Sequence, residues 1–448
     1  MTKRKQGVAV IAVLSLAAVA GCSETDDNAP PVFSPGWTEA PAVGQGATIG
    51  VQPFEMTDPE GDAFTASLAT SDPGLTAALD GAMETIELHA DYAVEGVVGV
   101  DVTLEDAAGA VATYSFDVTV LPIAWLARET WGTASGPEAR EHGSLVLDEE
   151  GGRVLLVTGS GYDPYMNPLA DVWEYDLQEQ VWTLLDPGGD APSGGGSKRV
   201  AQIPGQQVAY LFGGYGADGA PHGEFYRLDY ADGAADFTLL DQENPPGPRA
   251  LHAFGYDPEL GRFVMFGGFG GPIADDTWVM SLDGDAAVWE ELETTDPPTP
   301  RYGFFYGFDQ TRGRLIVYSG AQGTALVNPA TDTWILETRE TPAEWRLVAE
   351  GEEEGVPPGR RNGCSVYDSS NDRLFVFGGT PDAQTSSPGL FAFDARPGTV
   401  GWALIELEDE PPLRSSGFGF HDPAENTAAM GFGNTATAIY ADWNVLGY

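Results

Sequence analysis

The sequence contains little that would cross-link the chain, bind a metal or span a membrane. Among its 448 residues are two cysteines, Cys22 and Cys364, and five histidines, none of which forms an HxxxH or HxH pair. Two cysteines exclude a disulfide framework, and an isolated histidine is no metal site without other ligands converging on it. Long helical patterns are also absent, whereas 58 glycines and 11 tryptophans are typical of turn-rich all-β structure.

Basic residues are scarce as well. There are 21 lysines and arginines against 68 aspartates and glutamates, which gives a formal net charge of −47 at pH 7. A chain of this charge is repelled by nucleic acids and by anionic membrane surfaces, and it attracts cations. We therefore expect no nucleic-acid partner.

The N-terminus has the form of a cleaved leader. Three basic residues at positions 3 to 5 precede an apolar run from Gly7 to Ala20, which is shorter than the roughly 20 residues that span a bilayer as a helix. The run ends in "VAGC", which resembles the cleavage motif of bacterial lipoproteins. The resemblance implies a signal peptide over 1–21, a lipid on Cys22 and, because Ser23 is not Asp, the outer membrane, on its periplasmic face or at the cell surface. An ordinary secretory signal with an incidental cysteine is the alternative.

Two segments separate this leader from the repeats described below. Residues 22–31, "CSETDDNAPP", are polar, acidic and end in proline, which is typical of a flexible tether. Residues 32–121 contain short segments of alternating polarity between turn signals, which predicts a small β-sandwich. The phrases "TDPEGDAFTASL" and "VDVTLEDAAGAVATYSFDVTV" resemble the cadherin-like and immunoglobulin-like modules of bacterial surface proteins.

Four carboxylates of the predicted sandwich fall on expected loops: Asp58, Glu60, Asp62 and Asp106. Calcium takes six to eight oxygen ligands in flexible geometry, so these side chains are a candidate calcium site, although their spacing does not complete a ligand set. The alternative is that aspartate and glycine simply form tight turns.

From about residue 123 the sequence repeats itself. Six strand-like runs end in glycine, at Gly159, Gly214, Gly268, Gly320, Gly379 and Gly433, at intervals of 52 to 59 residues. Nineteen residues before these glycines stand Arg140, Gly195, Arg249, Arg301, Arg360 and Arg414, and an aspartate follows each of the five arginines by eight residues. A period near 50 with strand-like content predicts the blades of a propeller, and the aspartate predicts a hairpin turn after the first strand of each blade.

Aromatic residues recur within each repeat. The third strand carries Trp173, Tyr226, Trp278, Trp334, Phe391 or Trp443, and the fourth carries Trp182, Phe237, Trp289, Trp345 or Trp402. The double glycine, the following aromatic and the spaced tryptophan resemble the kelch repeat of β-propellers. We therefore predict an all-β chain in which residues 122–448 form a six-bladed kelch-type propeller, with the aromatics wedged between adjacent blades. The last repeat stops after its third strand, so we expect the strand near Trp131 to complete it and close the ring.

The sequence lacks the common catalytic signatures GxSxG, HExxH, CxxC and the Walker loop. Galactose oxidase, a kelch-type propeller, needs a cysteine bonded to a tyrosine and two histidines around copper. Here Tyr367 lies near Cys364, but the histidine constellation is not recognisable, so no copper cofactor is expected. Sialic-acid mutarotases share the fold, but their site loops cannot be matched to this sequence.

Two sets of residues are candidates for ligand binding. Sixfold symmetry would gather Arg140, Arg249, Arg301, Arg360 and Arg414 near the channel, where they would either pair with carboxylates of the blades or bind an anionic ligand. Asp163, Asp218 and Asp275 lie on the long loops that follow the glycines. The leading hypothesis is a membrane-anchored binding protein that presents its propeller to a protein or glycan. The alternative is a carbohydrate-active enzyme, mutarotase-like or oxidase-like, at the channel mouth.

Overall fold

The computed structural model describes residues 19–20, 28–80, 82–132, 134–161, 167–323, 328–351, 355–382, 385–398, 401–407, 410–435 and 438–447. Cys22 lies outside these residues. The chain divides into two compact units, Met1–Ile123 with Tyr448, and Ala124–Gly447. In the described part of the chain, no helix is both long and apolar enough to cross a membrane.

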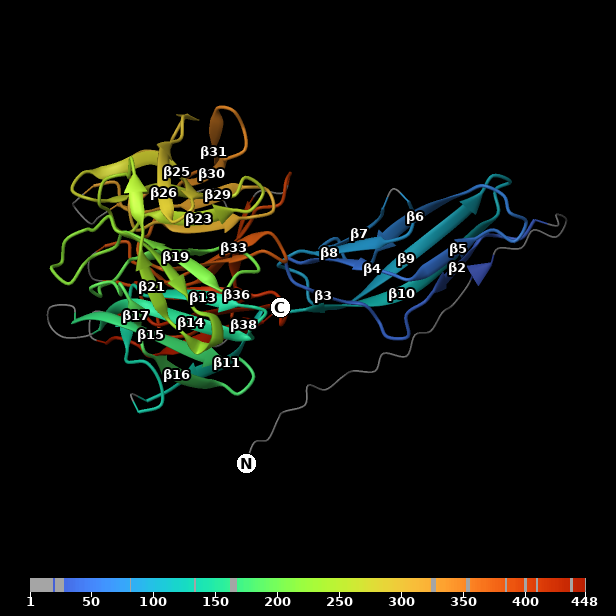
Figure 1. The fold of residues 1–448 in the computed structure, drawn as a ribbon. Helices are drawn as coiled ribbons and strands as arrows, with labels where there is room; N and C mark the ends of the chain where they lie inside the picture. The colour runs from blue at the N-terminus through green and yellow to red at the C-terminus, as the bar shows by residue number, and fades with distance from the viewer. Residues whose placement is uncertain are drawn as a thin grey trace. The chain divides into compact units, whose positions relative to one another are not determined.

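The first unit consists of short strands in small sheets (Figure 1). The strands are β1 (Val19–Ala20), β2 (Val32–Pro35), β3 (Ala42–Gly44), β4 (Thr48–Val51), β5 (Phe54–Thr57), β6 (Phe64–Thr70), β7 (Leu75–Leu79), β8 (Ile86–Ala90), β9 (Gly96–Asp106) and β10 (Val111–Leu121). Their order is β1-β10-β9-β6 with β3 beside β10 in one sheet, β4-β8-β7 in a second and β2-β5 in a third. Every second residue of β9 and β10 is buried, and these side chains pack in one core around Phe33. This core is what alternating polarity predicts for strands with one buried face.

The second unit contains six sheets within its described residues. Sheet 1 holds β12 (Arg140–Glu141), β13 (Ser144–Asp148), β14 (Arg153–Gly161), β15 (Asn167–Asp176) and β16 (Val181–Leu185); sheet 2 holds β17 (Gly188–Gly189), β18 (Arg199–Gln202), β19 (Val208–Phe212), β20 (Phe225–Asp229) and β21 (Asp236–Leu239), with the 3₁₀ turn η1 (Ala231–Gly233). Sheet 3 holds β22 (Asp241–Glu243), β23 (Ala253–Asp257), β24 (Arg262–Phe269), β25 (Ile273–Asp283) and β26 (Ala286–Glu291).

The remaining three sheets repeat this plan. Sheet 4 holds β27 (Thr294–Thr295), β28 (Phe305–Asp309), β29 (Arg314–Tyr318), β30 (Thr333–Glu337) and β31 (Ala343–Ala349); sheet 5 holds β32 (Cys364–Asp368), β33 (Arg373–Phe377), β34 (Leu390–Asp394) and β35 (Gly401–Ile405). Sheet 6 holds β36 (Phe418–Asp422), β37 (Thr427–Gly431), β38 (Asp442–Gly447) and β11 (Ala124–Thr130).

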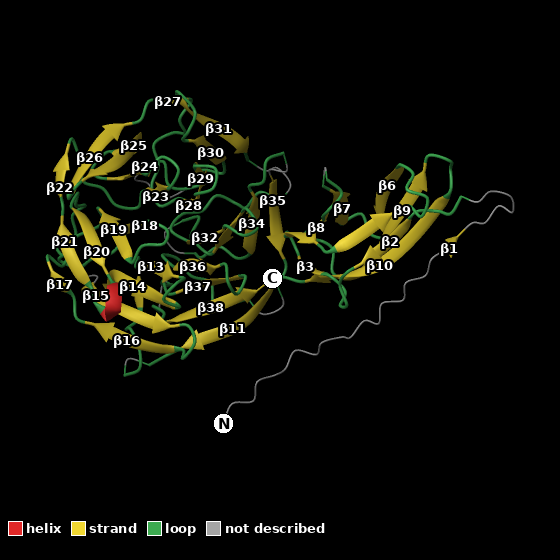
Figure 2. Ribbon diagram, turned by 45° about the vertical axis from the view of Figure 1, so that its right-hand side comes forward, coloured by secondary structure: helices red, strands yellow, loops and turns green. Residues whose placement is uncertain are grey.

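The six sheets stand in a ring (Figure 2). Their innermost strands are neighbours in the order β13, β18, β23, β28, β32, β36, and β36 again contacts β13. The unit is therefore a β-propeller, as the period of the repeat predicts.

The ring closes where its first and last strands meet. β11, which precedes the first repeat, pairs antiparallel with β38 and so supplies the fourth strand of sheet 6. The Trp131 ring lies 5.5 Å from the Trp443 ring. Trp131, however, follows β11, and Trp125 on that strand is the ring that reaches the preceding sheet, 5.9 Å from Phe377. Trp125 therefore occupies the position that a tryptophan of the fourth strand occupies in other sheets. The sequence pointed to the neighbourhood of Trp131 instead, because the strand begins further from Arg140 than the spacing in most of the other repeats suggests.

The fourth-strand aromatics wedge adjacent sheets together, as predicted. Each packs against the sheet before its own: Trp182 against Trp443 at 5.3 Å, Trp289 against Phe212 at 4.8 Å, Trp345 against Phe266 at 4.6 Å and Trp402 against Tyr318 at 4.7 Å, measured between ring centroids. Burial of such large rings supplies much of the adhesion between sheets.

The predicted hairpin turns are also confirmed. Asp257 accepts a hydrogen bond from the backbone N–H of Glu259, two residues on, and Asp309 accepts one from Thr311. In sheets 1, 4 and 5 the first-strand aspartate also pairs with an arginine five residues later, as in Arg373–Asp368 at 2.7 Å. The turn and the ion pair together hold the end of the innermost strand in these three sheets.

Candidate ligand-binding cavity of the propeller

The five repeat arginines lie inside the sheets. Each donates from Nε to the carbonyl two residues earlier and from Nη1 to the carbonyl eighteen residues later; for Arg301 these acceptors are Thr299 and Ser319. Four also bind a carboxylate of the third strand, in the pairs Arg140–Asp171, Arg249–Asp276, Arg301–Asp332 and Arg414–Asp442.

Their surroundings distinguish between the two roles that the sequence left open, pairing with carboxylates of the blades and binding an anionic ligand in the channel. The five arginines are at most 6% exposed. None of them lines the central cavity, which is the space among the innermost strands of the six sheets. Burial alone would raise the pKa of Asp332, but the hydrogen bonds and charge of Arg301 outweigh it and hold this pKa below its usual value. The geometry therefore favours the structural account of this position over anion binding in the channel.

Two of the three candidate loop carboxylates can be placed in the structure, since Asp163 falls outside the described residues. The side chain of Asp218 is 64% exposed and lies 3.0 Å from His222, and Asp275 is exposed. Neither Asp218 nor Asp275 lines the central cavity.

Two of the four candidate carboxylates of the first unit, Asp58 and Asp106, act as turn residues. Asp58 accepts hydrogen bonds from the backbone N–H groups of Glu60 and Asp62, and Asp106 accepts those of Ala108 and Ala110. Within the described ranges, no cluster of three or more histidine, cysteine, aspartate or glutamate side chains is placed to hold a metal ion. Calcium binding stays a prediction from the sequence.

The central cavity lies among the innermost strands of all six sheets of the second unit and has a volume of about 600 Å³. Its walls carry residues three, five and seven positions after the repeat arginine: after Arg301 these are Phe304, Tyr306 and Phe308. This is the alternation of a strand with one face toward the cavity. Eight aromatic residues border the cavity. Phe254, Phe304 and Phe418 are at most 8% exposed and pack in the core, whereas Tyr256, Tyr306, Phe308, Tyr367 and Phe420 are partly exposed.

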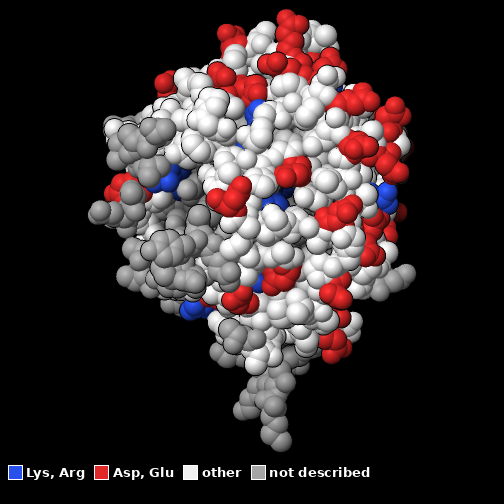
Figure 3. Space-filling model, turned by 60° about the vertical axis from the view of Figure 1, so that its left-hand side comes forward, with Lys and Arg blue, Asp and Glu red and all other residues white. Residues whose placement is uncertain are grey.

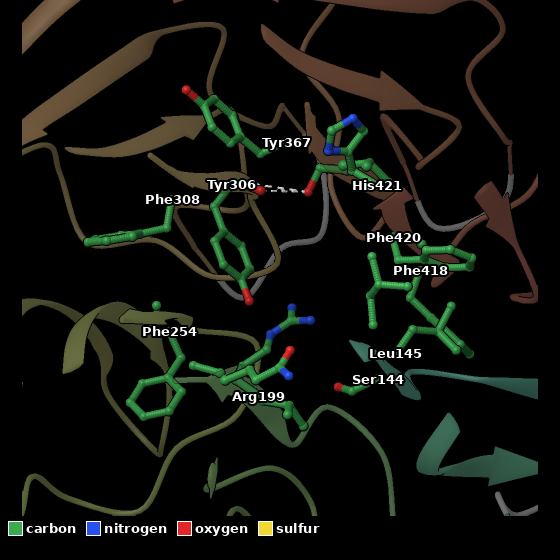
Figure 4. A pocket seen from close by; sticks show the side chains of 18 of the residues that line it. Ser144, Leu145, Arg199, Phe254, Tyr306, Phe308, Tyr367, Phe418, Phe420 and His421 are labelled. Atoms are coloured by element: carbon green, nitrogen blue, oxygen red, sulfur yellow. Dashed lines mark hydrogen bonds between the residues drawn. The ribbon is translucent and has the colours of Figure 1, made fainter. Parts of the chain in front are cut away.

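A single arginine lies among these rings in Figure 4. Arg199, on β18, donates from Nε to the carbonyl of His252 at 2.9 Å, and its guanidinium lies 5.4 Å from the centre of the Tyr306 ring. Of the described cavity-lining residues, Arg199 is the only lysine or arginine. Sheet 2 lacks the repeat arginine. Lys198 instead supplies a buried cation there, which donates hydrogen bonds to the carbonyls of Gly194 and Tyr215.

A histidine that is paired with an aspartate lies at another part of the cavity wall. His421 Nε2 is 3.1 Å from the buried Asp368 carboxylate, and the Ser369 hydroxyl is 3.4 Å from His421 Nδ1. Burial would raise the pKa of Asp368, but His421 and Arg373 hold it well below its usual range. The carboxylate is therefore ionised and lies beside the imidazole ring.

The protein environment shifts the pKa values of the cysteine and of two histidines of the propeller. Burial raises the pKa of the Cys364 thiol to about 12 and lowers that of His142 to about 3. His252 is fully buried beside Phe212, and burial lowers its pKa well below the usual value. These side chains are therefore neutral at pH 7.

The cavity residues were not predicted from the sequence. A pattern that marks some of them is nevertheless visible, because aromatic residues stand five and seven positions after the repeat arginine in two consecutive repeats: Phe254 and Tyr256, then Tyr306 and Phe308. Arg199 carried no such signal, since its repeat is the one that lacks the arginine.

Comparisons with known proteins agree with this fold. The chain is 24% identical over 268 residues to Adagio-like protein 3 of Oryza sativa subsp. japonica, which covers 58% of this chain and 41% of that protein. It is 28% identical over 257 residues to Kelch domain-containing protein 2 of Bos taurus, over 50% of this chain and 58% of that protein. The chain thus spans about half the length of these curated relatives.

One solved structure shows the likeness in three dimensions. The structure of YjhT has a TM-score of 0.53 and 14% sequence identity, and the match covers 69% of this chain and 95% of YjhT. No family model matches the sequence. The second unit has the fold of a kelch-type β-propeller.

Proposed function

We propose that this protein is a lipid-anchored binding protein of a bacterial cell envelope, whose propeller binds an acidic glycan in the central cavity. The likeness to kelch proteins supports a propeller that serves as an interaction domain. A protein ligand, which the sequence leaves open, would need a larger contact surface than a cavity of about 600 Å³.

The observation that carries the proposal is the aromatic cavity with one arginine in it. Aromatic faces pack against the apolar faces of sugar rings, and a guanidinium binds a carboxylate through two parallel hydrogen bonds. A volume of about 600 Å³ is in the range of small-ligand sites. Acidic side chains are scattered over the face drawn in Figure 3 and outnumber the basic ones, so an anionic ligand needs such a local cation to bind.

Replacing Arg199 by glutamine tests the proposal. We expect R199Q to weaken binding of a carboxylated oligosaccharide roughly tenfold or more, because a charged hydrogen bond is lost, and to leave binding of its carboxyl-reduced form unchanged. Isothermal titration against a panel of uronate oligosaccharides measures this. R346Q is the matched control, since Arg346 carries the same charge on β31 outside the cavity. Equal affinities of R199Q and R346Q for the acidic sugar would refute the proposal.

A second candidate function, catalysis at the cavity, rests on His421 with its Asp368 partner. An imidazole oriented by a carboxylate is a general base in many enzymes. The same titrations distinguish the two functions when the sugar is recovered and analysed. Chemical conversion that disappears in H421A, while binding persists, supports the enzyme; unchanged sugar supports binding alone.

The proposed anchor has its own test. We expect the full chain to incorporate labelled palmitate and to sediment with membranes when it is expressed in a Gram-negative host. C22S should do neither, because the thiol is the acylated group. C364S is the matched control, because Cys364 is buried in the propeller. Membrane association of C22S equal to that of the wild type would contradict lipidation at this position.

A further inference from the structure

Sheet 5 departs from the pattern of the repeat arginine. In sheets 1, 3 and 4 the arginine binds an aspartate, and the tryptophan two residues after that aspartate donates its indole N–H to the same carboxylate, as Trp334 does to Asp332 at 2.7 Å. In sheet 5 the two positions hold Gly389 and Phe391. Both the carboxylate and the indole donor are therefore missing beside Arg360.

The backbone prevents a side-chain carboxylate at this position. Gly389 has a φ of +88°, and a Cβ atom there would lie 2.8 Å from the Phe391 ring. A residue with a side chain would be strained in this conformation and would have to displace the ring. The absence of the aspartate is thus built into the local structure.

Arg360 is left as a buried cation without an acidic partner among the described residues. It is 1% exposed; its Nε donates to Pro358 O at 3.1 Å, and Nη1 donates to Gly378 O at 3.3 Å and Pro388 O at 3.2 Å. Its guanidinium lies 5.0 Å from the Phe391 ring centre, and burial lowers its pKa. Buried charges in proteins are normally paired, so this arrangement needs an explanation.

The guanidinium borders a cavity of about 530 Å³. Most of the remaining wall is apolar, from Pro358, Pro381, Phe391 and Leu404, with the hydroxyls of Thr385 and Ser387. Glu410 also contributes to the wall and is exposed, so water screens its charge. None of the lining residues belongs to the central cavity.

We propose that this second cavity binds a small carboxylic acid with an apolar body. The ligand carboxylate takes the place that an aspartate occupies beside the other repeat arginines, and Arg360 binds it. The apolar body lies against Phe391, Leu404 and the prolines. A neutral ligand would leave the guanidinium unpaired, and a strongly hydrophilic acid would not cover the apolar wall.

Calorimetric titration with a panel of phenylacetate, 4-phenylbutyrate and octanoate tests the site, with the corresponding amides as neutral probes. We expect at least one acid to bind saturably and its amide to bind roughly tenfold to hundredfold more weakly, as for the loss of a charged hydrogen bond. R360M should reduce acid binding by a similar factor. R396Q, which removes the charge of an arginine that lies outside the cavity in the turn after β34, should bind as the wild type does.

A second variant keeps the test valid if R360M fails to fold. Leu404 is 48% exposed at the cavity wall, so L404W fills the space without touching the arginine, and it should lose acid binding while its melting temperature stays near that of the wild type. R199Q should leave acid binding intact, which separates this site from the central cavity. Absence of saturable binding by the wild type, equal binding of acid and amide, or full binding by L404W would overturn the proposal.

Discussion

Replacement of Arg301 by methionine is expected to lower the free energy of unfolding of the propeller by about 3–5 kcal/mol, because it leaves a largely buried carboxylate without its cation. Arg301 is fully buried and contacts both oxygens of Asp332, at 2.6 and 2.9 Å. The Asp332 side chain is 18% exposed, so water cannot replace the guanidinium well. Urea unfolding followed by tryptophan fluorescence measures the change.

R346M is the control for this prediction. Arg346 also pairs with a carboxylate, that of Glu337, but its side chain is 48% exposed. Exposed ion pairs contribute about 0–1 kcal/mol, so this variant should unfold at nearly the wild-type urea concentration. A double variant R301M/D332L should recover part of the loss, because it removes both buried charges. Equal effects of R301M and R346M would show that burial of the repeat arginine does not matter.

Replacement of Trp443 by alanine is expected to lower the free energy of unfolding by about 3–5 kcal/mol and to loosen the closure of the ring. Trp443 is 2% exposed. Its ring packs against Trp182 of sheet 1, at 5.3 Å, and against Trp131 after β11, at 5.5 Å. The alanine leaves a cavity where the first and last sheets meet. Hydrogen exchange should therefore be faster in β11 and β38 than in β24, in addition to the lower urea midpoint.

Leu184, on β16 beside this seam, provides the matched control. It is 56% exposed, so L184A removes an apolar side chain without opening a cavity and should change the unfolding free energy by about 0.5 kcal/mol or less. A Trp443 variant with a normal midpoint and normal exchange in β11 would mean that the aromatic seam does not hold the ring closed.

The fold could be predicted further than the site because its signals are local. The arginine and the aspartate eight residues later bracket one strand, and the aromatic two residues after Asp276 or Asp332 marks the next. Strand alternation and hairpin turns depend on neighbours in the chain, so a repeated pattern predicts them. The strand that ends directly before Trp131 completes the last sheet, but the spacing between strands varies with loop length, so only the pairing of β11 with β38 identifies Trp125 as the ring that contacts the preceding sheet.

The repeat arginines show where sequence reasoning ends. Their spacing placed them near the innermost strands, but it left open whether the guanidinium groups face the channel or the interior. The aspartates that bind Arg140 and Arg301 come 31 residues later in the chain. Only the pairing of neighbouring strands shows that each carboxylate reaches the arginine, and that Arg199 and the aromatic rings line the channel instead.

By itself the sequence determined the all-β class, the repeating strands, the hairpin turns and the aromatics that join sheets, since each follows from alternation and spacing along the chain. It also contains the exception at Gly389, where an aspartate stands in four other repeats. The tertiary structure alone decided which aromatic at the closing strand contacts the preceding sheet, which arginines are paired and which borders an apolar cavity. Those outcomes depend on contacts between residues far apart in the chain, and such contacts leave no local periodicity.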